Sequence, residues 1–249
     1  MKQLGVISGT GIATLHGLEL QTQHQVDTPY GKPSAAIAQG TFNDCCIYFL
    51  QRHGQEGRIP PHKVNYRANV WALQSLGVSE IVSVNAVGGI GKEMQPGRLV
   101  IPDQIIDYTW GRAHTFDEGE DGPLRHVDFT EPYDRDLRMA LVSVAAAIGA
   151  DCQATAVYGV TQGPRLETAA EIQRMAADGC DLVGMTGMPE ASLAREIGIS
   201  YASICMVVNM AAGLGDVPIS LETIHEIVRT EAGAVAALLA ALLEQRYSS

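Results

Sequence analysis

Short apolar runs alternate with longer stretches of helical periodicity along the chain, and this alternation limits the possible folds more than any other feature. Runs rich in Val and Ile suit strands buried in a sheet, and the periodic stretches suit the helices that connect such strands. The sequence therefore predicts an α/β fold in a single domain over residues 1–249. The predicted strands are Leu4 to Ser8, Cys46 to Leu50, Glu80 to Asn85, Arg98 to Pro102, Thr155 to Thr161, Asp181 to Met185 and Tyr201 to Asn209. The predicted helices are Val64 to Leu76, Arg135 to Ile148, Thr168 to Ala177, Pro189 to Glu196 and Leu221 to Gln245.

One helix start and one long connection are well marked. The spacing of Thr168 and Glu171 is typical of a capping box, in which the two side chains satisfy backbone amides at the start of a helix. The segment from Thr109 to Tyr133 contains an acidic, glycine-containing stretch and is predicted to be a long loop. Loops of that length are usually functional or mobile.

Composition narrows the class of protein. With 46% hydrophobic residues, the 249 residues suffice for a sizeable core. The 17 basic and 28 acidic residues give a net charge of −11, which disfavours a nucleic-acid partner. The longest apolar stretch, Ala232 to Leu243, is shorter than the roughly 20 residues that span a bilayer. The N-terminus lacks a secretory h-region, and the five cysteines show no C-x-x-C spacing, so a cytoplasmic protein with reduced thiols is expected.

Residues that follow the first two predicted strands suit an anion, and ligands of open parallel sheets bind beyond the carboxyl ends of the strands. The first strand leads into Gly9-Thr10-Gly11, where glycines let the backbone approach a ligand, although a tight turn explains them equally well. The second leads into Arg52 and His53, a permanent cation beside a titratable imidazole. A lone histidine is more often structural, but the pair favours an oxyanion site.

The later strands end in further polar or small residues. Asn85 to Gly89 exposes backbone amides, and Met185-Thr186 follows the sixth strand. Glu167 precedes the capped helix, and Asn209 ends an almost wholly apolar run, where an amide is costly unless it is hydrogen-bonded. Each of these has a structural alternative. Gly88-Gly89 could form only a turn, Glu167 could be a solvated carboxylate, and Asn209 could cap a turn.

Two sequence features could suggest a metal site, and neither supports one. The His225-Glu226 pair lacks the second histidine of H-E-x-x-H, and the acidic residues of 117–121 are better explained as a solvated loop. No metal is expected.

Six ordered blocks that cover nearly the whole chain resemble the trimeric purine nucleoside phosphorylase and methylthioadenosine phosphorylase family. The blocks are Gly9-Thr10-Gly11, Arg52-His53-Gly54, Val64-Asn65-Tyr66-Arg67-Ala68-Asn69, Asn85-Ala86-Val87-Gly88, Gly163-Pro164-Arg165 and Met188-Pro189-Glu190. The resemblance implies a mixed, mostly parallel central sheet flanked by helices. It also implies a phosphorolysis, in which inorganic phosphate attacks the anomeric carbon of a purine nucleoside and the base departs. Phosphate is then a co-substrate, and neither a metal nor an organic cofactor is required.

The resemblance also assigns site residues by position. The family's phosphate contacts match Thr10, Arg52, His53, Ala86 and Thr186, and the residue under the ribose matches Met185. His53 and Asn209 are the expected catalytic residues. An oxocarbenium-like transition state needs a bound anion on one side and neutralisation of the departing purine on the other.

The base end departs from the methylthioadenosine pattern. Family members that act on a 6-amino base have Asp-Tyr-Asp where this chain has Asn209-Met210-Ala211, and here Leu166 and Glu167 replace Phe and Ser. Asn209 can donate to O6 and Glu167 can accept from N1–H, the pattern that a 6-oxopurine presents. Adenine would leave the Glu167 carboxylate facing a lone pair.

The sugar end follows the methylthioadenosine branch. Leu221 and Ile224 match valines around the 5′ group in that branch, one helical turn apart, although helix core is an alternative on spacing alone. His126 matches a histidine that the family contributes from a neighbouring subunit of a homotrimer. The expected substrate is 5′-methylthioinosine. The alternatives are methylthioadenosine, inosine or guanosine as substrate, and a nucleotide-binding module without catalysis.

Overall fold

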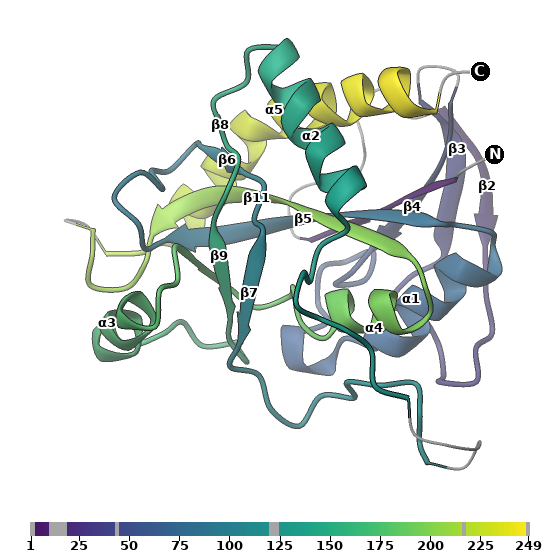
Figure 1. The fold of residues 1–249 in the computed structure, drawn as a ribbon, viewed down its shortest axis with the longest axis horizontal. Helices are drawn as coiled ribbons and strands as arrows, with labels where there is room; N and C mark the ends of the chain where they lie inside the picture. Colours follow the sequence, from purple (N-terminus) through teal and green to yellow (C-terminus); the bar gives the residue numbers. More distant parts are fainter. Residues whose placement is uncertain (1–2, 10–18, 43–44, 120–124, 216–217, 248–249) are drawn as a thin grey trace.

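The computed structural model describes residues 3–9, 19–42, 45–119, 125–215 and 218–247, which form an α/β fold with a mixed, mostly parallel sheet. The helices lie on the two sides of the sheet (Figure 1). Its strands are β1 (Leu4–Ser8), β2 (Glu19–His24), β3 (Ile37–Phe42), β4 (Cys45–Gln51), β5 (Glu80–Gly89), β6 (Leu99–Val100), β7 (Gln104–Asp107), β8 (Cys152–Gln153), β9 (Val157–Val160), β10 (Leu182–Gly184) and β11 (Ser200–Met210). The predicted fold class is confirmed.

Strand β5 organises the sheet because three other strands pair with it. β1 and β11 run parallel to β5, and β10 pairs antiparallel with its last two residues. β1 also pairs parallel with β4, so that Ser8 lies beside Gln51 on one side and Val84 on the other. The residues that follow these three strand positions therefore meet at one edge of the sheet, as the sequence predicts.

Four strands were not expected from the sequence. β2 and β3 form an antiparallel hairpin next to β4, and their sequences ELQTQH and IAQGTF lack a continuous apolar run. β7 pairs with β9 and β8 pairs with β6, each over few residues. Of the predicted strand Arg98 to Pro102, only Leu99–Val100 pairs in the sheet. β7 and β8 are short strands at edges of the sheet, and such strands bury too little apolar surface to show in a sequence pattern.

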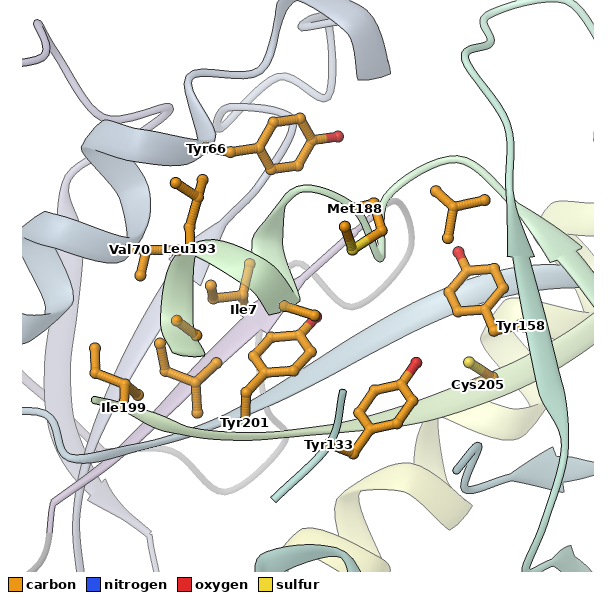
Figure 2. Close-up of a cluster of buried hydrophobic side chains, with 14 of the residues drawn as sticks. Ile7, Tyr66, Val70, Tyr133, Tyr158, Met188, Leu193, Ile199, Tyr201 and Cys205 are labelled. Atoms are coloured by element: carbon orange, nitrogen blue, oxygen red, sulfur yellow. The ribbon is translucent and has the colours of Figure 1, made fainter. Parts of the chain in front are cut away.

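One pair of helices covers each face of the sheet, and a further helix, Ala169–Ala177, packs in a separate, smaller core with Val183 of β10 (Figure 1). They are α1 (Tyr66–Ser75), α2 (Arg135–Ala147), α3 (Ala169–Ala177), α4 (Glu190–Glu196) and α5 (Leu221–Arg246), with a short 3₁₀ helix at Pro61–Lys63. Alternate residues of β11 serve the two layers: Tyr201 and Cys205 pack in the core with α1 and α4, whereas Ala202 and Ile204 pack in the core with α2 and α5. Figure 2 shows the first of these cores.

Side chains at the helix starts fix where the helices begin. Thr168 accepts from the backbone amide of Glu171 and the Glu171 carboxylate accepts from that of Thr168, which confirms the predicted capping box. Asn65, Asp134 and Ser220 cap α1, α2 and α5 in a similar way. Each such cap stabilises its helix by about 1 kcal/mol.

The segment from Thr109 to Tyr133 contains neither helix nor strand in its described parts, 109–119 and 125–133, as predicted. A search of the described residues for a helix with the length and apolar character of a membrane span finds none.

Candidate functional site

A cavity of about 430 Å³ opens at the edge of the sheet where β1, β4, β5, β10 and β11 end. Most of the residues predicted for the site line it together: Arg52, His53, Ala86, Leu166, Glu167, Met185, Thr186, Asn209, Leu221 and Ile224. Of the remaining predictions, Thr10 lies outside the described residues. His126 is exposed and is not among the residues that line this cavity in the described chain.

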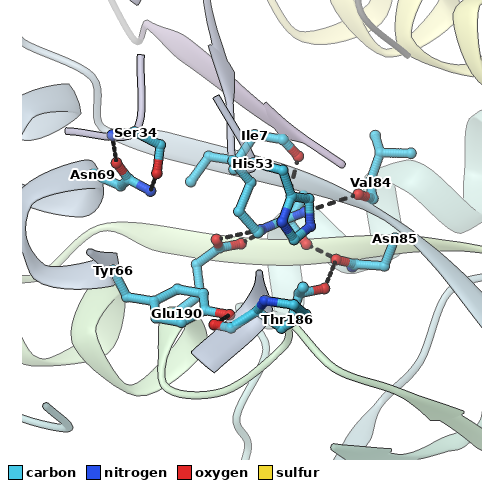
Figure 3. A network of polar contacts seen from close by, with 12 residues as sticks. Ile7, Ser34, His53, Tyr66, Asn69, Val84, Asn85, Thr186 and Glu190 are labelled. Atoms are coloured by element: carbon cyan, nitrogen blue, oxygen red, sulfur yellow. Dashed lines mark hydrogen bonds and ion pairs between the residues drawn. The ribbon is translucent and has the colours of Figure 1, made fainter. Parts of the chain in front are cut away.

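Arg52 is completely buried and already paired. Its Nε and Nη2 atoms each donate to a carboxylate oxygen of Glu190 at 2.8 Å, and the Tyr201 hydroxyl donates to the same carboxylate at 2.9 Å. Figure 3 shows this carboxylate and the carbonyls of Ile7 and Val84, which accept from Nη2 and Nη1 of Arg52. Burial is the largest single influence and lowers the pKa of Arg52, but the charge of Glu190 and its hydrogen bonds, together with the neighbouring tyrosines, outweigh it and raise that pKa. The sequence predicted the cation but not its internal partner.

His53 presents one ring nitrogen to the cavity as an acceptor. Its Nδ1 lies 2.7 Å from the carbonyl oxygen of Ile59, and since a carbonyl only accepts, Nδ1 carries the proton and Nε2 keeps a lone pair. Burial, followed by the nearby charge of Arg52, lowers the pKa of His53. A side chain on Gly9 would lie 3.4 Å from Nη1 of Arg52 and 3.8 Å from the His53 ring, so glycine keeps this space open.

A chain of buried hydrogen bonds leads from β5 and β11 to Thr186. The Thr186 hydroxyl donates to Oδ1 of Asn85 at 2.9 Å, and Nδ2 of Asn85 donates to the hydroxyls of Ser83 and Ser203 (Figure 3). Ala86 is the exposed member of the otherwise buried strand β5, and it lines the cavity. The polar groups beside Arg52 are therefore held by partners inside the protein.

A bulge in β11 brings Asn209 to the cavity. The pairing of β11 with β5 shifts by one residue between Val207 and Asn209, so Val208 stays buried while Asn209 is half-exposed. Nδ2 of Asn209 donates to the carbonyl of Met210 at 2.7 Å and retains a second N–H for a ligand. The sequence placed Asn209 at a strand end, but the bulge that turns it toward the cavity has no signal in the apolar pattern.

Glu167 stands between two cavities. It lines the 430 Å³ cavity and also a second one of about 410 Å³, whose other walls include Trp110 and Thr161. The Thr161 hydroxyl donates to Oε1 of Glu167 at 2.6 Å. Leu166, beside it, is 46% exposed. Thr161 was predicted only as the end of a strand.

Arg112, in the long loop, is a residue that the sequence analysis missed. Its guanidinium donates to the backbone carbonyls of Thr161, Gln162, Met185 and Met188, and to the Tyr66 hydroxyl. It therefore ties the loop to the strand ends that carry Glu167 and Met185. No motif marks it, because most of its partners are backbone carbonyls far away in sequence.

The first turns of α5 form the remaining wall. Leu221 is 73% exposed and lines the cavity, so it is not helix core, whereas Ile224 is half-buried against the core beneath α5. His225, which the sequence analysis considered only as part of an incomplete metal motif, also lines the cavity, as does Val228. The spacing from Leu221 to His225 is one helical turn and could have indicated this.

Comparison with known proteins identifies the family and the relatives that this chain resembles. Residues 3–244 match the family model described as the Phosphorylase superfamily. A protein of Pseudomonas syringae pv. tomato, described as a probable S-methyl-5′-thioinosine phosphorylase, is 47% identical over 98% of this chain and 99% of its own. A 6-oxopurine nucleoside phosphorylase of Pyrococcus furiosus is 41% identical over 98% of this chain and 92% of its own. Among solved structures, methylthioadenosine phosphorylase from Schistosoma mansoni in complex with adenine superposes with a TM-score of 0.94 at 32% identity, covering 98% of this chain and 92% of that one.

Proposed function

The chain belongs to the phosphorylase superfamily, and from this premise we propose that it catalyses the phosphorolysis of 5′-methylthioinosine to hypoxanthine and 5-methylthioribose 1-phosphate. One observation carries the proposal: Glu167 and Asn209 line the same cavity as the apolar Leu221 and Ile224. The first pair suits a 6-oxopurine, and the second suits an apolar 5′ group. The membership confirms the family predicted from the sequence motifs.

Phosphate binds at the buried end of the cavity in this proposal. Arg52 supplies a guanidinium whose charge Glu190 already balances. The backbone N–H groups at Ala86 and Thr186 and the side chain of Thr10 contribute neutral donors, because the Thr186 hydroxyl proton is bound to Asn85. Nε2 of His53 accepts a hydrogen bond from the protonated oxygen of hydrogen phosphate, because Nδ1 holds the ring proton. An unprotonated oxygen then attacks C1′ as the bond from C1′ to N9 breaks and N9 keeps the bonding electrons. The sugar phosphate releases the proton that hydrogen phosphate carried, and the base takes up one proton from solvent, which gives neutral hypoxanthine.

The departing base is neutralised at the other end. Asn209 donates its free N–H to O6, and this bond strengthens as negative charge spreads over O6 and N7 in the transition state. Glu167 accepts from N1–H. Met185 lies under the ribose, and Leu166 contacts the base.

The 5′-methylthio group lies against Leu221 and Ile224. The proposal includes a cytoplasmic homotrimer in purine salvage, in which His126 of one subunit reaches the cavity of its neighbour. The exposure of His126 supports this part. Phosphate is the co-substrate, and no metal or organic cofactor takes part.

The His225 imidazole on the same wall favours inosine as a second substrate, since it offers a polar partner to a 5′-hydroxyl. The Pyrococcus furiosus relative supports this alternative.

The test is an assay of base release with 5′-methylthioinosine, methylthioadenosine, inosine and guanosine at equal concentration, with and without phosphate. We expect phosphate-dependent release that is fastest from 5′-methylthioinosine. Release without phosphate would indicate a hydrolase, and preference for methylthioadenosine would overturn the assignment of the base.

A further inference from the structure

Glu167 has two carboxylate oxygens, and the structure shows that one of them already has a partner. The Thr161 hydroxyl donates to Oε1 at 2.6 Å, the length of a hydrogen bond to an ionised carboxylate. The same hydroxyl also lies 3.3 Å from the carbonyl oxygen of Gly184. The contact to the charged carboxylate is much the shorter of the two, so the hydroxyl donates mainly to Glu167.

Thr161 is itself held firmly on both sides. Its N–H is bound to Gly184 in β10, and its carbonyl accepts from Nη2 of Arg112 at 3.2 Å. The β-branched side chain has few accessible rotamers, so a fixed backbone places the hydroxyl in a fixed position. Thr161 lines the second cavity, whereas Glu167 lines both. The hydroxyl therefore holds Glu167 from the side away from the nucleoside.

This arrangement bears on a base with a 2-amino group. Guanine presents two adjacent donors, N1–H and the 2-amino N–H, and a carboxylate matches such a pair by offering both oxygens side by side. Hypoxanthine presents N1–H alone and needs one oxygen. With Oε1 directed at Thr161, Glu167 offers Oε2 to the base, and a 2-amino group meets only an oxygen that is held toward Thr161, so its hydrogen bond to Glu167 is weakened.

We propose that Thr161 is a specificity-determining residue that, by holding Oε1 of Glu167, makes the base end favour hypoxanthine over guanine. The inference rests on the proposed function, since it takes Glu167 to face the N1 edge of a 6-oxopurine. Leaving one donor of the bound base without a full acceptor lowers affinity by about tenfold.

The experiment compares 5′-methylthioinosine with 5′-methylthioguanosine in phosphate-dependent base release. The wild-type ratio of kcat/KM should favour 5′-methylthioinosine, and Thr161→Val, which replaces the hydroxyl with a methyl group, should reduce that ratio by about tenfold. Thr161→Ser keeps the hydroxyl and should restore the wild-type ratio. A ratio in Thr161→Val equal to that of the wild type overturns the proposal.

Thr109→Val is the matched control. The Thr109 hydroxyl is buried and has no hydrogen-bond partner among the described residues, so its removal should leave the ratio unchanged. If Thr161→Val does not fold, the wild-type protein still decides: hypoxanthine should bind about tenfold more tightly than guanine, and equal dissociation constants contradict the proposal. A wild-type protein that cleaves methylthioadenosine instead of either substrate refutes the proposed function itself.

Discussion

The cavity has a buried end around Arg52 and an open end around Glu167 and Leu221. The polar groups at the two ends differ in how far they are enclosed by the protein. At the buried end, Arg52, Glu190 and Asn85 are almost completely enclosed and bind one another or neighbouring groups. At the open end, Glu167 and Asn209 are half-exposed, and Leu221 is 73% exposed.

In the proposed function, phosphate binds at the buried end and the nucleoside at the open end. Buried charges that are already paired need little rearrangement when phosphate binds. Removing one of them, however, leaves its partner uncompensated. Changes at the buried end should therefore affect both folding and phosphate binding, whereas changes at the open end should affect the choice of substrate.

The largest effect is expected from Arg52→Ala. The substitution leaves the buried Glu190 carboxylate without its cation, which should lower the free energy of unfolding by about 3–5 kcal/mol and raise the KM for phosphate strongly. Arg52→Lys should recover only part, because an ammonium cannot bind both carboxylate oxygens in the same way. Denaturant unfolding and phosphate titrations measure these effects.

Arg98→Ala is the control for that comparison. Arg98 pairs with Asp151, which is exposed, so its loss should cost little stability and leave the phosphate KM unchanged. Equal losses of unfolding free energy in Arg52→Ala and Arg98→Ala would mean that the buried ion pair contributes no more stability than the exposed one.

Asn209→Ala should have the next largest effect, on catalysis and not on folding. Loss of a donor that strengthens in the transition state should lower kcat by roughly 10²–10³. Asn209→Asp should shift selectivity toward methylthioadenosine, because a carboxylate accepts from N6 and repels O6. An unchanged ratio of kcat/KM for 5′-methylthioinosine and methylthioadenosine in Asn209→Asp would show that Asn209 does not read the base.

Arg112→Lys tests the connection between the two strand ends. Lysine cannot reach several carbonyls at once, so kcat/KM should fall by about tenfold. Arg138 also donates to backbone carbonyls, those of Pro102 and Ala154, away from the cavity. Arg138→Lys should therefore lower only the melting temperature, and equal losses of activity in the two variants would make Arg112 a purely structural residue.

A smaller effect is expected from Leu221→Ser. Apolar contacts with the methylthio group are worth about 1–3 kcal/mol, and the exposure of Leu221 favours the lower value. The preference for 5′-methylthioinosine over inosine should narrow, while the melting temperature stays near that of the wild type. A fixed preference in both Leu221→Ser and Ile224→Ser would remove α5 from the 5′ site.

The smallest effect concerns pH. Burial lowers the pKa of His53 in the folded protein, so the unfolded chain binds more protons below its ordinary pKa of 6.5. Stability should therefore decrease as pH falls through that value, and His53→Gln should show a smaller decrease in melting temperature between about pH 7.5 and about pH 5.5. If the melting temperatures of the wild type and His53→Gln change with pH by the same amount, His53 is not buried in its neutral form.

The sequence determined much of the fold and the composition of the cavity. The apolar runs of β1, β4, β5 and β11 and the caps of the helices are local patterns, and local patterns survive in a sequence without knowledge of partners. Residues that directly follow parallel strands meet at one edge of a sheet, so Arg52, Asn85 and Asn209 could be grouped before the fold was known. The sequence did not predict the hairpin of β2 and β3, because these two strands lack a continuous apolar run.

Tertiary structure alone decided which partners these groups have. Glu190 lies 138 residues from Arg52 along the chain, and Arg112 reaches carbonyls up to 76 residues away. The shift between β11 and β5 that turns Asn209 outward depends on the pairing of two strands. Hydrophobic periodicity reports which side chains are buried, but hydrogen bonds and ion pairs depend on distances and angles that only the folded chain fixes.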